Sequence, residues 1–295
     1  MGKVFFDNFS ICKSNFEEAE DALKFKLRKL CFEGPESDLK LTQNTQPAIL
    51  TVSLAAHRAL FSETGLEPKL LAGHSLGEYT ALVVSEALQF SDAVRLVRLR
   101  GGAMQEAVPK GKGAMAALLG AQAEGVTDLC REVTEELGGD ETVSPANFNG
   151  GGQVVVSGTR RAVEKMIDIS PSRGIRRAVM LEVSAPFHCK LMEPAAYRVA
   201  DALKSISVSK PKIPYIANVD ALVHNDAEGI SDRLIAQIPN PVRWEESMRL
   251  LPTYGISRAV EIGPGKVLTG LLRRTNKEIK TFNIETPNDI KEMKS

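Results

Sequence analysis

A short apolar stretch, a glycine-flanked serine and a helix-forming run follow one another in LLAGHSLGEYTALVV, residues 70–84. Ser75 lies in the G-x-S-x-G pattern, which places a serine on a sharp turn between a strand and a helix. Gly73 and Gly77 permit the close backbone approach that such a turn requires. The following helix directs its free N–H groups toward the serine oxygen, and the Leu76 N–H is an expected oxyanion donor. This unit predicts an α/β fold with a reactive serine; the alternative is a glycine-rich connection with an incidental serine.

The composition is that of an ordinary globular protein with no overall preference for a charged partner. The chain has 295 residues, 43% of them hydrophobic, and 37 basic residues balance 37 acidic ones. This length allows two domains or one large domain with an insertion, and zero formal charge favours neither nucleic acid nor a membrane surface. The start of the sequence has charges among its apolar residues, so a signal peptide is not expected. No run reaches the roughly 18 apolar residues of a membrane span.

The cysteines indicate a reducing environment. Cys12, Cys31, Cys130 and Cys189 are scattered and form no C-x-x-C pair. Neither a zinc site nor a disulfide framework is predicted, and no metal or other cofactor is expected. We therefore expect a cytoplasmic protein.

Residues 111–184 differ in pattern from their surroundings and predict a small subdomain. Strand-like and helix-like segments follow one another there in the order β-α-β-β-α-β, from GAMAALLG to RRAVMLEVS, which is the ferredoxin-like pattern. We expect this subdomain to be inserted in an α/β-hydrolase-like large domain made of residues 1–110 and 185–295. In the large domain, Ser14 is expected to cap the first helix and Ser91 the fourth, and the last dozen residues are expected to form a loose tail.

A reactive serine needs a base, and histidine suits this role near neutral pH. His57 lies in an Ala- and Leu-rich helix, where a packing or surface role is expected. His74 adjoins Ser75 but is expected to point away from its hydroxyl, and His224 lies in a polar loop where we expect it to be solvated. His188 follows a predicted strand and a proline, at a loop end of the kind where catalytic groups gather. His188 is therefore the candidate base.

Arg100 interrupts an apolar helix face. Ala93, Val97, Arg100 and Met104 are three or four residues apart and share one side of the predicted helix. A charge on a buried face is costly unless it is paired. The guanidinium either reaches the surface, pairs with a structural carboxylate, or binds a substrate carboxylate through its two-pronged fork. The third option would select an acyl group with a free acid at its far end.

Several longer motifs carry a resemblance to a known family. They are GHSLGEYTALV, RLRGGAMQEAVPKGKGAMAALLG, SPANFNGGGQVVVSG, APFHCKLM, NPVRW and EIGPGKVLTGL. With these motifs, from Gly2 to about Leu272, the sequence resembles the malonyl-CoA:acyl-carrier-protein transacylases of bacterial type II fatty acid synthesis. The resemblance implies transfer of a malonyl group from malonyl-CoA to the phosphopantetheine thiol of acyl carrier protein, through a malonyl-serine ester.

The resemblance also implies roles for individual residues. Ser75 would be the nucleophile, and His188 the general base and then acid, oriented by the main-chain carbonyl of Gln237. Arg100 would bind the malonyl carboxylate. Phe187 resembles the bulky residue found where malonyl is preferred over a branched methylmalonyl group. The further substrate-binding residues expected are Gln46, Asn218, Met104, Phe187 and His74.

The sequence departs from the family at its start. Family members begin with a strand and a loop of the type F-P-G-Q-G-S-Q ahead of the segment that matches MGKVFFDNF, and the loop glutamine supplies a second oxyanion donor. No residue here matches that glutamine. We expect either that the start is set after this loop, which we favour, or that the chain is a short form. For the chain as it stands, we expect weaker transfer, lower stability and uncovered apolar neighbours inside the sheet.

Two other functions stay open. A serine esterase or thioesterase would hydrolyse its ester, but no acid is suitably placed for a triad in the order Ser, Asp, His, and Arg100 would have no role. An inactive acyl-carrier-binding form would bind its ligands without acylation. For a transferase we expect a monomer whose partners are malonyl-CoA and an acidic carrier protein. Basic segments 109–113 and 172–177 are candidate carrier-docking surfaces.

Overall fold

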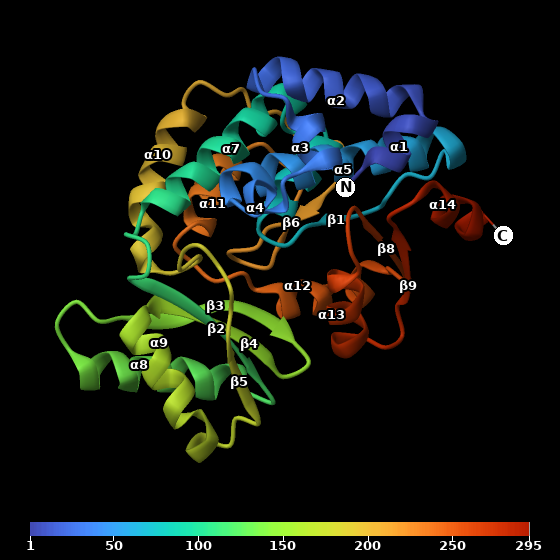
Figure 1. Ribbon diagram of the computed structural model, residues 1–295. Coiled ribbons are helices and arrows are strands. Elements are labelled where there is room, and N and C mark those ends of the chain that lie inside the picture. Colours follow the sequence, from blue (N-terminus) through green and yellow to red (C-terminus); the bar gives the residue numbers. More distant parts are fainter. Residues whose placement is uncertain (295) are drawn as a thin grey trace.

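The structure is a computed structural model that describes residues 1–294, and a large helix-rich part lies above a smaller sheet in Figure 1. The α-helices are α1 (Lys3–Asn8), α2 (Ser10–Leu23), α3 (Leu27–Glu33), α4 (Glu36–Leu39), α5 (Thr42–Thr64), α6 (Leu76–Val84), α7 (Phe90–Glu106), α8 (Ala123–Leu137), α9 (Arg160–Ile169), α10 (Glu193–Leu203), α11 (Ile230–Gln237), α12 (Trp244–Leu250), α13 (Val267–Thr275) and α14 (Pro287–Lys294). The strands are β1 (Leu71–Ala72), β2 (Gly113–Leu119), β3 (Val143–Gly150), β4 (Gln153–Thr159), β5 (Arg177–Met180), β6 (Tyr215–Ile216), β7 (Val223–His224), β8 (Arg258–Ile262) and β9 (Lys280–Ile284). The 3₁₀ helices are η1 (Ser170–Arg173), η2 (Lys190–Met192) and η3 (Leu251–Tyr254).

The large part is built around helix α5, which packs against α2, α6 and α7. Small residues such as Ala48, Ala55 and Ala59 are fully buried on α5 and allow the neighbouring helices to approach closely. Two short parallel strand pairs lie beside these helices: β1 pairs with β6, and β8 pairs with β9. Strand β7 pairs with β6 as an antiparallel edge strand. No described strand pairs with both β1 and β8, so these two strands belong to separate sheets.

The small part is a four-stranded antiparallel sheet in the order β3-β4-β2-β5, and α8 and α9 pack on it (Figure 1, green to yellow). Along the chain its elements follow the predicted order β-α-β-β-α-β. Side chains alternate between its two faces, as the period of a strand requires. Ala116 and Leu118 join the core beneath the helices, while Met115 and Ala117 pack toward Leu181 on the other face.

The two parts are joined at the free edge of β3. Phe148 donates its N–H to the carbonyl of Val242 at 2.9 Å, and Val242 donates to the carbonyl of Ala146 at 2.9 Å. Val242 lies just before α12, in the large part. The loop that follows β5 lies on the face of the small sheet opposite α8 and α9, where Phe187 packs on the cores of both parts. The junction therefore brings this loop next to the elements of the large part.

Three predictions of local structure were wrong. Helix α2 begins at Ser10 and not at Ser14, because Cys12, two residues before Ser14, is already buried. Helix α7 begins at Phe90, whose side chain is buried, so Ser91 lies inside the helix and does not cap it. The polar C-terminal segment forms no loose tail as far as residue 294: α14 follows β9, buries Ile290 and has its start fixed by backbone hydrogen bonds to Asp289. Ser295 lies outside the described residues.

The described residues contain no helix that combines the length and the apolar character needed to cross a membrane. All four cysteines are free thiols with buried side chains.

Candidate active site

Ser75 occupies the turn between β1 and α6 in a strained backbone conformation. Its φ of 50° and ψ of −103° lie in a region that residues with a side chain rarely adopt. Gly73 is required by close approach, since a Cβ at this position would lie 1.9 Å from the carbonyl carbon of Gly77. Leu76 is the first residue of α6, so its N–H has no acceptor within the helix. The turn thus places a hydroxyl beside a backbone donor.

His188 reaches Ser75 from the loop after β5. Its Nε2 lies 2.8 Å from Ser75 Oγ, and its Nδ1 lies 2.9 Å from the main-chain carbonyl oxygen of Gln237. Because a carbonyl only accepts, Nδ1 carries the ring proton, and Nε2 is left to accept the serine proton. Burial, with the charge of Arg100 nearby, lowers the pKa of His188 to about 3. The imidazole is therefore neutral at pH 7, as a general base must be.

Arg100 lies on α7 with only 1% of its surface exposed. It donates from Nη1 to Gln46 Oε1 at 2.8 Å, and from Nη2 to Gln237 Oε1 at 2.8 Å and to Ser75 Oγ at 3.0 Å. The ring of Tyr79 lies 5.3 Å from its guanidinium carbon. A guanidinium has five N–H donors, and its buried Nε–H has no acceptor here. Arg100 neither reaches the surface nor forms an ion pair with any residue from 1 to 294.

A buried network behind the turn holds Ser75, His188 and Arg100 in place. Asn218 accepts the Ser75 N–H at 2.6 Å and donates to the Gly73 carbonyl at 2.7 Å. Glu78 Oε2 accepts from the Asn218 N–H at 3.0 Å and from Gln237 Nε2 at 2.7 Å. Sequence reasoning missed Glu78, because an acid in the first turn of a helix usually faces solvent. Its one signal was that LGEYTALVV is otherwise almost wholly apolar.

The other expected site residues lie around this centre at different distances from the chemistry. Gln46 contacts both of its expected neighbours: its Oε1 accepts from Arg100, and its Nε2 lies 3.9 Å from Met104 Sδ. Phe187 directly precedes His188 and is half-buried. His74 turns its ring away from the serine hydroxyl and contacts Asn149 Oδ1 at 2.9 Å.

The remaining histidines lie apart from the serine. His57 is half-buried on α5, where burial lowers the pKa of its imidazole. The expectation that His224 is solvated was wrong. Its Nε2 lies 2.9 Å from Asp220 Oδ2, and only 16% of its side chain is exposed. His224 belongs to β7, whose pairing with β6 places its ring 5.8 Å from the ring of Tyr215.

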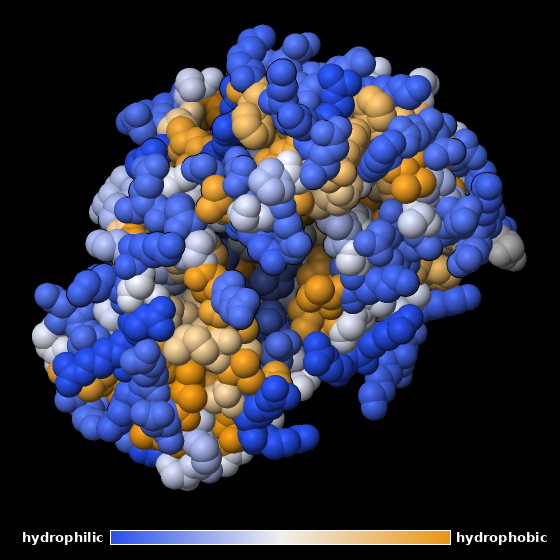
Figure 2. All heavy atoms as spheres, viewed as in Figure 1, coloured by the Kyte–Doolittle hydropathy of each residue, from blue (hydrophilic) through white to orange (hydrophobic). Residues whose placement is uncertain are grey.

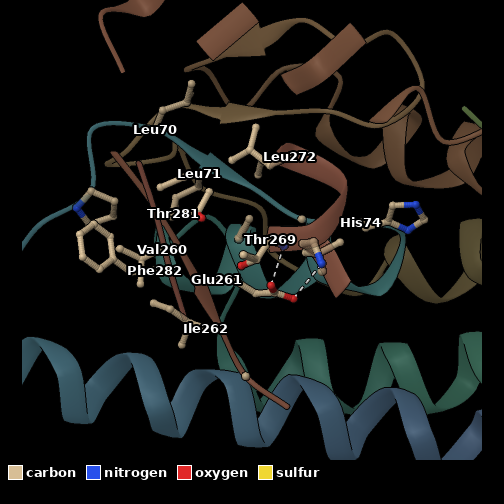
Figure 3. A pocket seen from close by; sticks show the side chains of 18 of the residues that line it. Leu70, Leu71, His74, Val260, Glu261, Ile262, Thr269, Leu272, Thr281 and Phe282 are labelled. Carbon is tan, nitrogen blue, oxygen red and sulfur yellow. Dashed lines mark hydrogen bonds between the residues drawn. The ribbon is translucent and has the colours of Figure 1, made fainter. Parts of the chain in front are cut away.

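A cavity of about 770 Å³ borders the serine turn and lies between β1 and β8 (Figure 3). The strands β1 and β8 line it from two sides with Leu71, Val260 and Ile262, and His74 lies at its end. The Glu261 carboxylate at its floor accepts backbone N–H groups at the start of α13. Ser75, His188 and Arg100 are not among its lining residues, whereas His74 and Leu76 on either side of Ser75 are.

The molecular surface is hollowed where the large and small parts meet, and apolar side chains flank the hollow (Figure 2).

Comparisons with known proteins agree with this site. The model of the acyl transferase domain family matches residues 1–294. The malonyl CoA-acyl carrier protein transacylase of Bacillus subtilis strain 168 is 45% identical over 290 residues, which cover 98% of this chain and 90% of that relative. The chain belongs to the malonyl CoA-acyl carrier protein transacylase family.

Two solved structures of the family show the same fold. The acyl-carrier-protein-S-malonyltransferase of Bartonella henselae matches with a TM-score of 0.94 and 44% identity, over 99% of this chain and 93% of that one. A malonyl-transacylase in complex with a type II PKS acyl-carrier protein matches with a TM-score of 0.94 and 41% identity, over 98% and 93% of the two chains. The predicted fold class, an α/β-hydrolase-like domain with a ferredoxin-like insert, is confirmed.

Proposed function

We propose that this chain transfers a malonyl group from malonyl-CoA to the phosphopantetheine thiol of acyl carrier protein, for fatty acid biosynthesis. Ser75 carries the malonyl group between the two thiols as an ester. The reaction needs no cofactor, since both substrates are activated as thioester and thiol.

The observation that carries this proposal is the buried guanidinium beside the serine. Arg100 donates to Ser75 Oγ at 3.0 Å, while its Nε–H lacks an acceptor. An acyl group bound as an ester to Ser75 would lie against this charge. A carboxylate at the far end of a three-carbon acyl group supplies the acceptor that the Nε–H lacks and an opposite charge in direct contact with the guanidinium. An acetyl group would supply neither.

The first half-reaction forms the ester. His188 Nε2 accepts the Ser75 hydroxyl proton as Oγ attacks the thioester carbonyl carbon of malonyl-CoA. The oxyanion of the tetrahedral intermediate accepts from the Leu76 N–H, and one such donor is typically worth ~3 kcal/mol. The carbon–sulfur bond then breaks, and the CoA thiolate takes the proton from His188.

The second half-reaction reverses these roles. The carrier thiol gives its proton to His188 Nε2, and its sulfur attacks the ester carbonyl carbon. Collapse of the intermediate breaks the bond to Ser75 Oγ, which recovers the proton from His188. Gln237 supports both half-reactions. Its main-chain carbonyl oxygen lies 2.9 Å from His188 Nδ1 and accepts the Nδ1 proton, so that Nε2 is left to accept protons from the reacting groups.

A serine esterase is the second candidate, and one contact weighs against it. In an esterase triad an acid holds the histidine, whereas here a main-chain carbonyl does so. A neutral carbonyl stabilises an imidazolium less than a carboxylate does, which suits attack by a thiol more than by water.

The proposal is completed by three further assignments. Phe187, Met104 and His74 contribute to acyl-group and tail binding. The large domain comprises residues 1–110 and 185–295, and the small subdomain comprises residues 111–184. The protein works in the cytoplasm, in keeping with its four free thiols.

Intact-protein mass spectrometry after brief exposure to malonyl-CoA tests this function. We expect one malonyl adduct on the natural sequence, none on Ser75→Ala, and far less on Arg100→Ala. Holo-acyl carrier protein should discharge the adduct as malonyl-carrier, not as free malonate. Discharge to malonate alone would favour the esterase, and a folded protein that binds malonyl-CoA without an adduct would favour the inactive binding form.

A further inference from the structure

Two opposite charges are buried behind the serine turn without touching each other. Arg100 on α7 and Glu78 on α6 are each at most 1% exposed. Gln237 joins them: its Oε1 accepts from Arg100 Nη2 at 2.8 Å, and its Nε2 donates to Glu78 Oε2 at 2.7 Å. A buried charge needs a counter-charge, and this carboxylate–amide–guanidinium chain supplies one to each partner.

The two oxygens of Glu78 are used unequally. Oε2 accepts both hydrogen bonds, from Gln237 Nε2 and from the Asn218 N–H, while buried Oε1 has no partner. A proton on Oε1 would therefore leave both bonds intact. Gln237 and Asn218 would stay in position, and with them His188 and Ser75.

The surroundings of Glu78 hold it near the point of protonation. The pKa of the Glu78 carboxyl is raised to about 7, and burial is the largest cause. The negative charge of Asp220 also raises this pKa, whereas the hydrogen bonds from Gln237 and Asn218 and the positive charge of Arg100 lower it. The other titratable groups that face it, the hydroxyls of Tyr79 and Tyr215, have pKa values raised to about 12 and stay neutral. A further negative charge near Arg100 would tip Glu78 to its neutral form.

A substrate carboxylate on Arg100 brings that further charge. The buried site would then hold one positive and two negative charges, which the low local polarity makes costly. We propose that Glu78 is a positioning residue that balances Arg100 through Gln237 while the site is empty, and that it takes a proton from solvent onto Oε1 when a substrate carboxylate binds Arg100. This inference rests on the proposed function, because it assigns the malonyl carboxylate to Arg100.

Binding of malonyl-CoA to the Ser75→Ala variant tests the inference without turnover. Isothermal titration calorimetry at pH 7.5, in phosphate and in Tris, should show net proton uptake as a difference in binding enthalpy. The dissociation constant should rise roughly tenfold between pH 6 and pH 9, the effect of a one-unit change in the pKa of a single group. Acetyl-CoA has the same CoA part without the carboxylate, so it corrects for protons bound by the CoA phosphates.

Substitutions then identify the group. In the Ser75→Ala background, Glu78→Gln should abolish the carboxylate-dependent proton uptake and make malonyl-CoA affinity nearly independent of pH. Asp220→Asn keeps Glu78 and its burial but removes a negative charge that adds to the effect of burial on the pKa of Glu78, so the midpoint of the pH profile should move to lower pH. Glu86→Gln, at an exposed carboxylate just after α6, is the matched control and should leave the profile unchanged.

The outcomes separate the two proposals. If malonyl-CoA binds with the same pH dependence and proton uptake as acetyl-CoA, the role of Glu78 is wrong while the transferase function stands. If Glu78→Gln does not fold, the shift in Asp220→Asn decides, and an unmoved midpoint overturns the inference. If the folded protein binds no malonyl-CoA at any pH, both proposals fail.

Discussion

Arg100 illustrates how one side chain selects a substrate. Its three bonds, to Gln46, Gln237 and Ser75, leave from two nitrogens of one planar group, and the acyl carboxylate is expected to use the donors that remain. Lysine keeps the charge but lacks this planar fork. The geometry of the guanidinium should therefore matter more than its charge.

Arg100→Lys should lower kcat/KM for malonyl-CoA by about 10- to 100-fold. This range follows from about 1.5–3 kcal/mol for a hydrogen bond to a charged group. Acetyl-CoA, which presents no carboxylate, should lose far less in a matched acylation assay. Arg98→Lys, on the same helix but over the ring of Phe25, is the control that should retain activity. Equal losses with both thioesters would contradict carboxylate recognition.

Single residues differ in how far the sequence reveals them. Ser75 can be recognised from the sequence because two glycines flank it in the G-x-S-x-G pattern. Arg100 can be recognised because it interrupts an apolar helix face. The main-chain carbonyl of Gln237 that orients His188 cannot be recognised from the residue type, because every residue has a carbonyl. Only the resemblance to a family located it. Glu78 was missed because the partners that bury it, Gln237 and Asn218, lie far away in the sequence.

At the scale of elements, the serine turn uses its two glycines differently. A Cβ on Gly73 would overlap the backbone of Gly77, whereas a Cβ on Gly77 would meet nothing within 4 Å. The sequence pattern treats the two positions alike. The structure shows that one is needed for close packing and that the other has room for a side chain.

Gly73→Ala should therefore destabilise the protein by about 3 kcal/mol, the upper end of the range for overpacked sites. Gly77→Ala should be neutral or stabilising by about 0.5–1 kcal/mol, because it removes a glycine from helix α6. Urea unfolding of both variants measures the difference. Similar stabilities for the two variants would show that the turn relaxes around Gly73.

The two basic segments lie at opposite ends of the small sheet. A Cβ on Gly113, which follows Lys112, would lie 2.3 Å from Pro186 in the loop of His188. Arg177 pairs with Leu119 at the far end of β2. An acidic carrier whose arm reaches Ser75 should therefore meet Lys110 and Lys112 first.

Charge reversal distinguishes the two ends. The double change Lys110→Glu and Lys112→Glu should slow carrier-dependent discharge about tenfold at low salt and leave acylation by malonyl-CoA unchanged. The matched pair Arg176→Glu and Arg177→Glu should leave both rates nearly unchanged. Stopped-flow or quenched-flow discharge assays would show it, and a larger effect at Arg176 and Arg177 would place the carrier elsewhere.

Elements were predictable where their pattern is contained in their own residues. The order β2-α8-β3-β4-α9-β5 follows from local alternation and helical period, and it was predicted in full. Helix starts were not, because burial of Cys12 and Phe90 against other elements extends α2 and α7 beyond their polar caps. The same reason accounts for α14, a mostly polar helix that is anchored by buried Ile290 and by Met293, which packs on the same core.

At the scale of the whole molecule, Glu78 connects the site to stability. Its pKa rises from 4.5 to about 7 on folding. Between these values the folded state holds a proton that the unfolded state has lost, so the contribution of Glu78 to stability falls as pH rises through this window. The carboxylate that assists the site is thus a cost to the fold at neutral and higher pH.

Glu78→Gln should gain stability relative to the natural sequence as pH rises from 5 to 8. The gain should approach about 3 kcal/mol, from 1.36 kcal/mol per pKa unit. Urea unfolding at several pH values measures it, with Glu86→Gln as the exposed control. A difference between Glu78→Gln and the natural sequence that stays constant with pH would show that Glu78 does not change its protonation on folding in this range.

The hydrogen bond between Arg100 and Gln237 joins residues 137 positions apart, across the whole small subdomain. During synthesis at about 5–20 residues per second, Arg100 therefore waits roughly 7–27 s for this partner. The small sheet is contiguous in sequence and can assemble within that interval. Until α11 has left the ribosome, Glu78 on α6 and Arg100 on α7 lack the Gln237 side-chain amide that joins their buried charges. The insert is thus expected to fold before the domain that contains it.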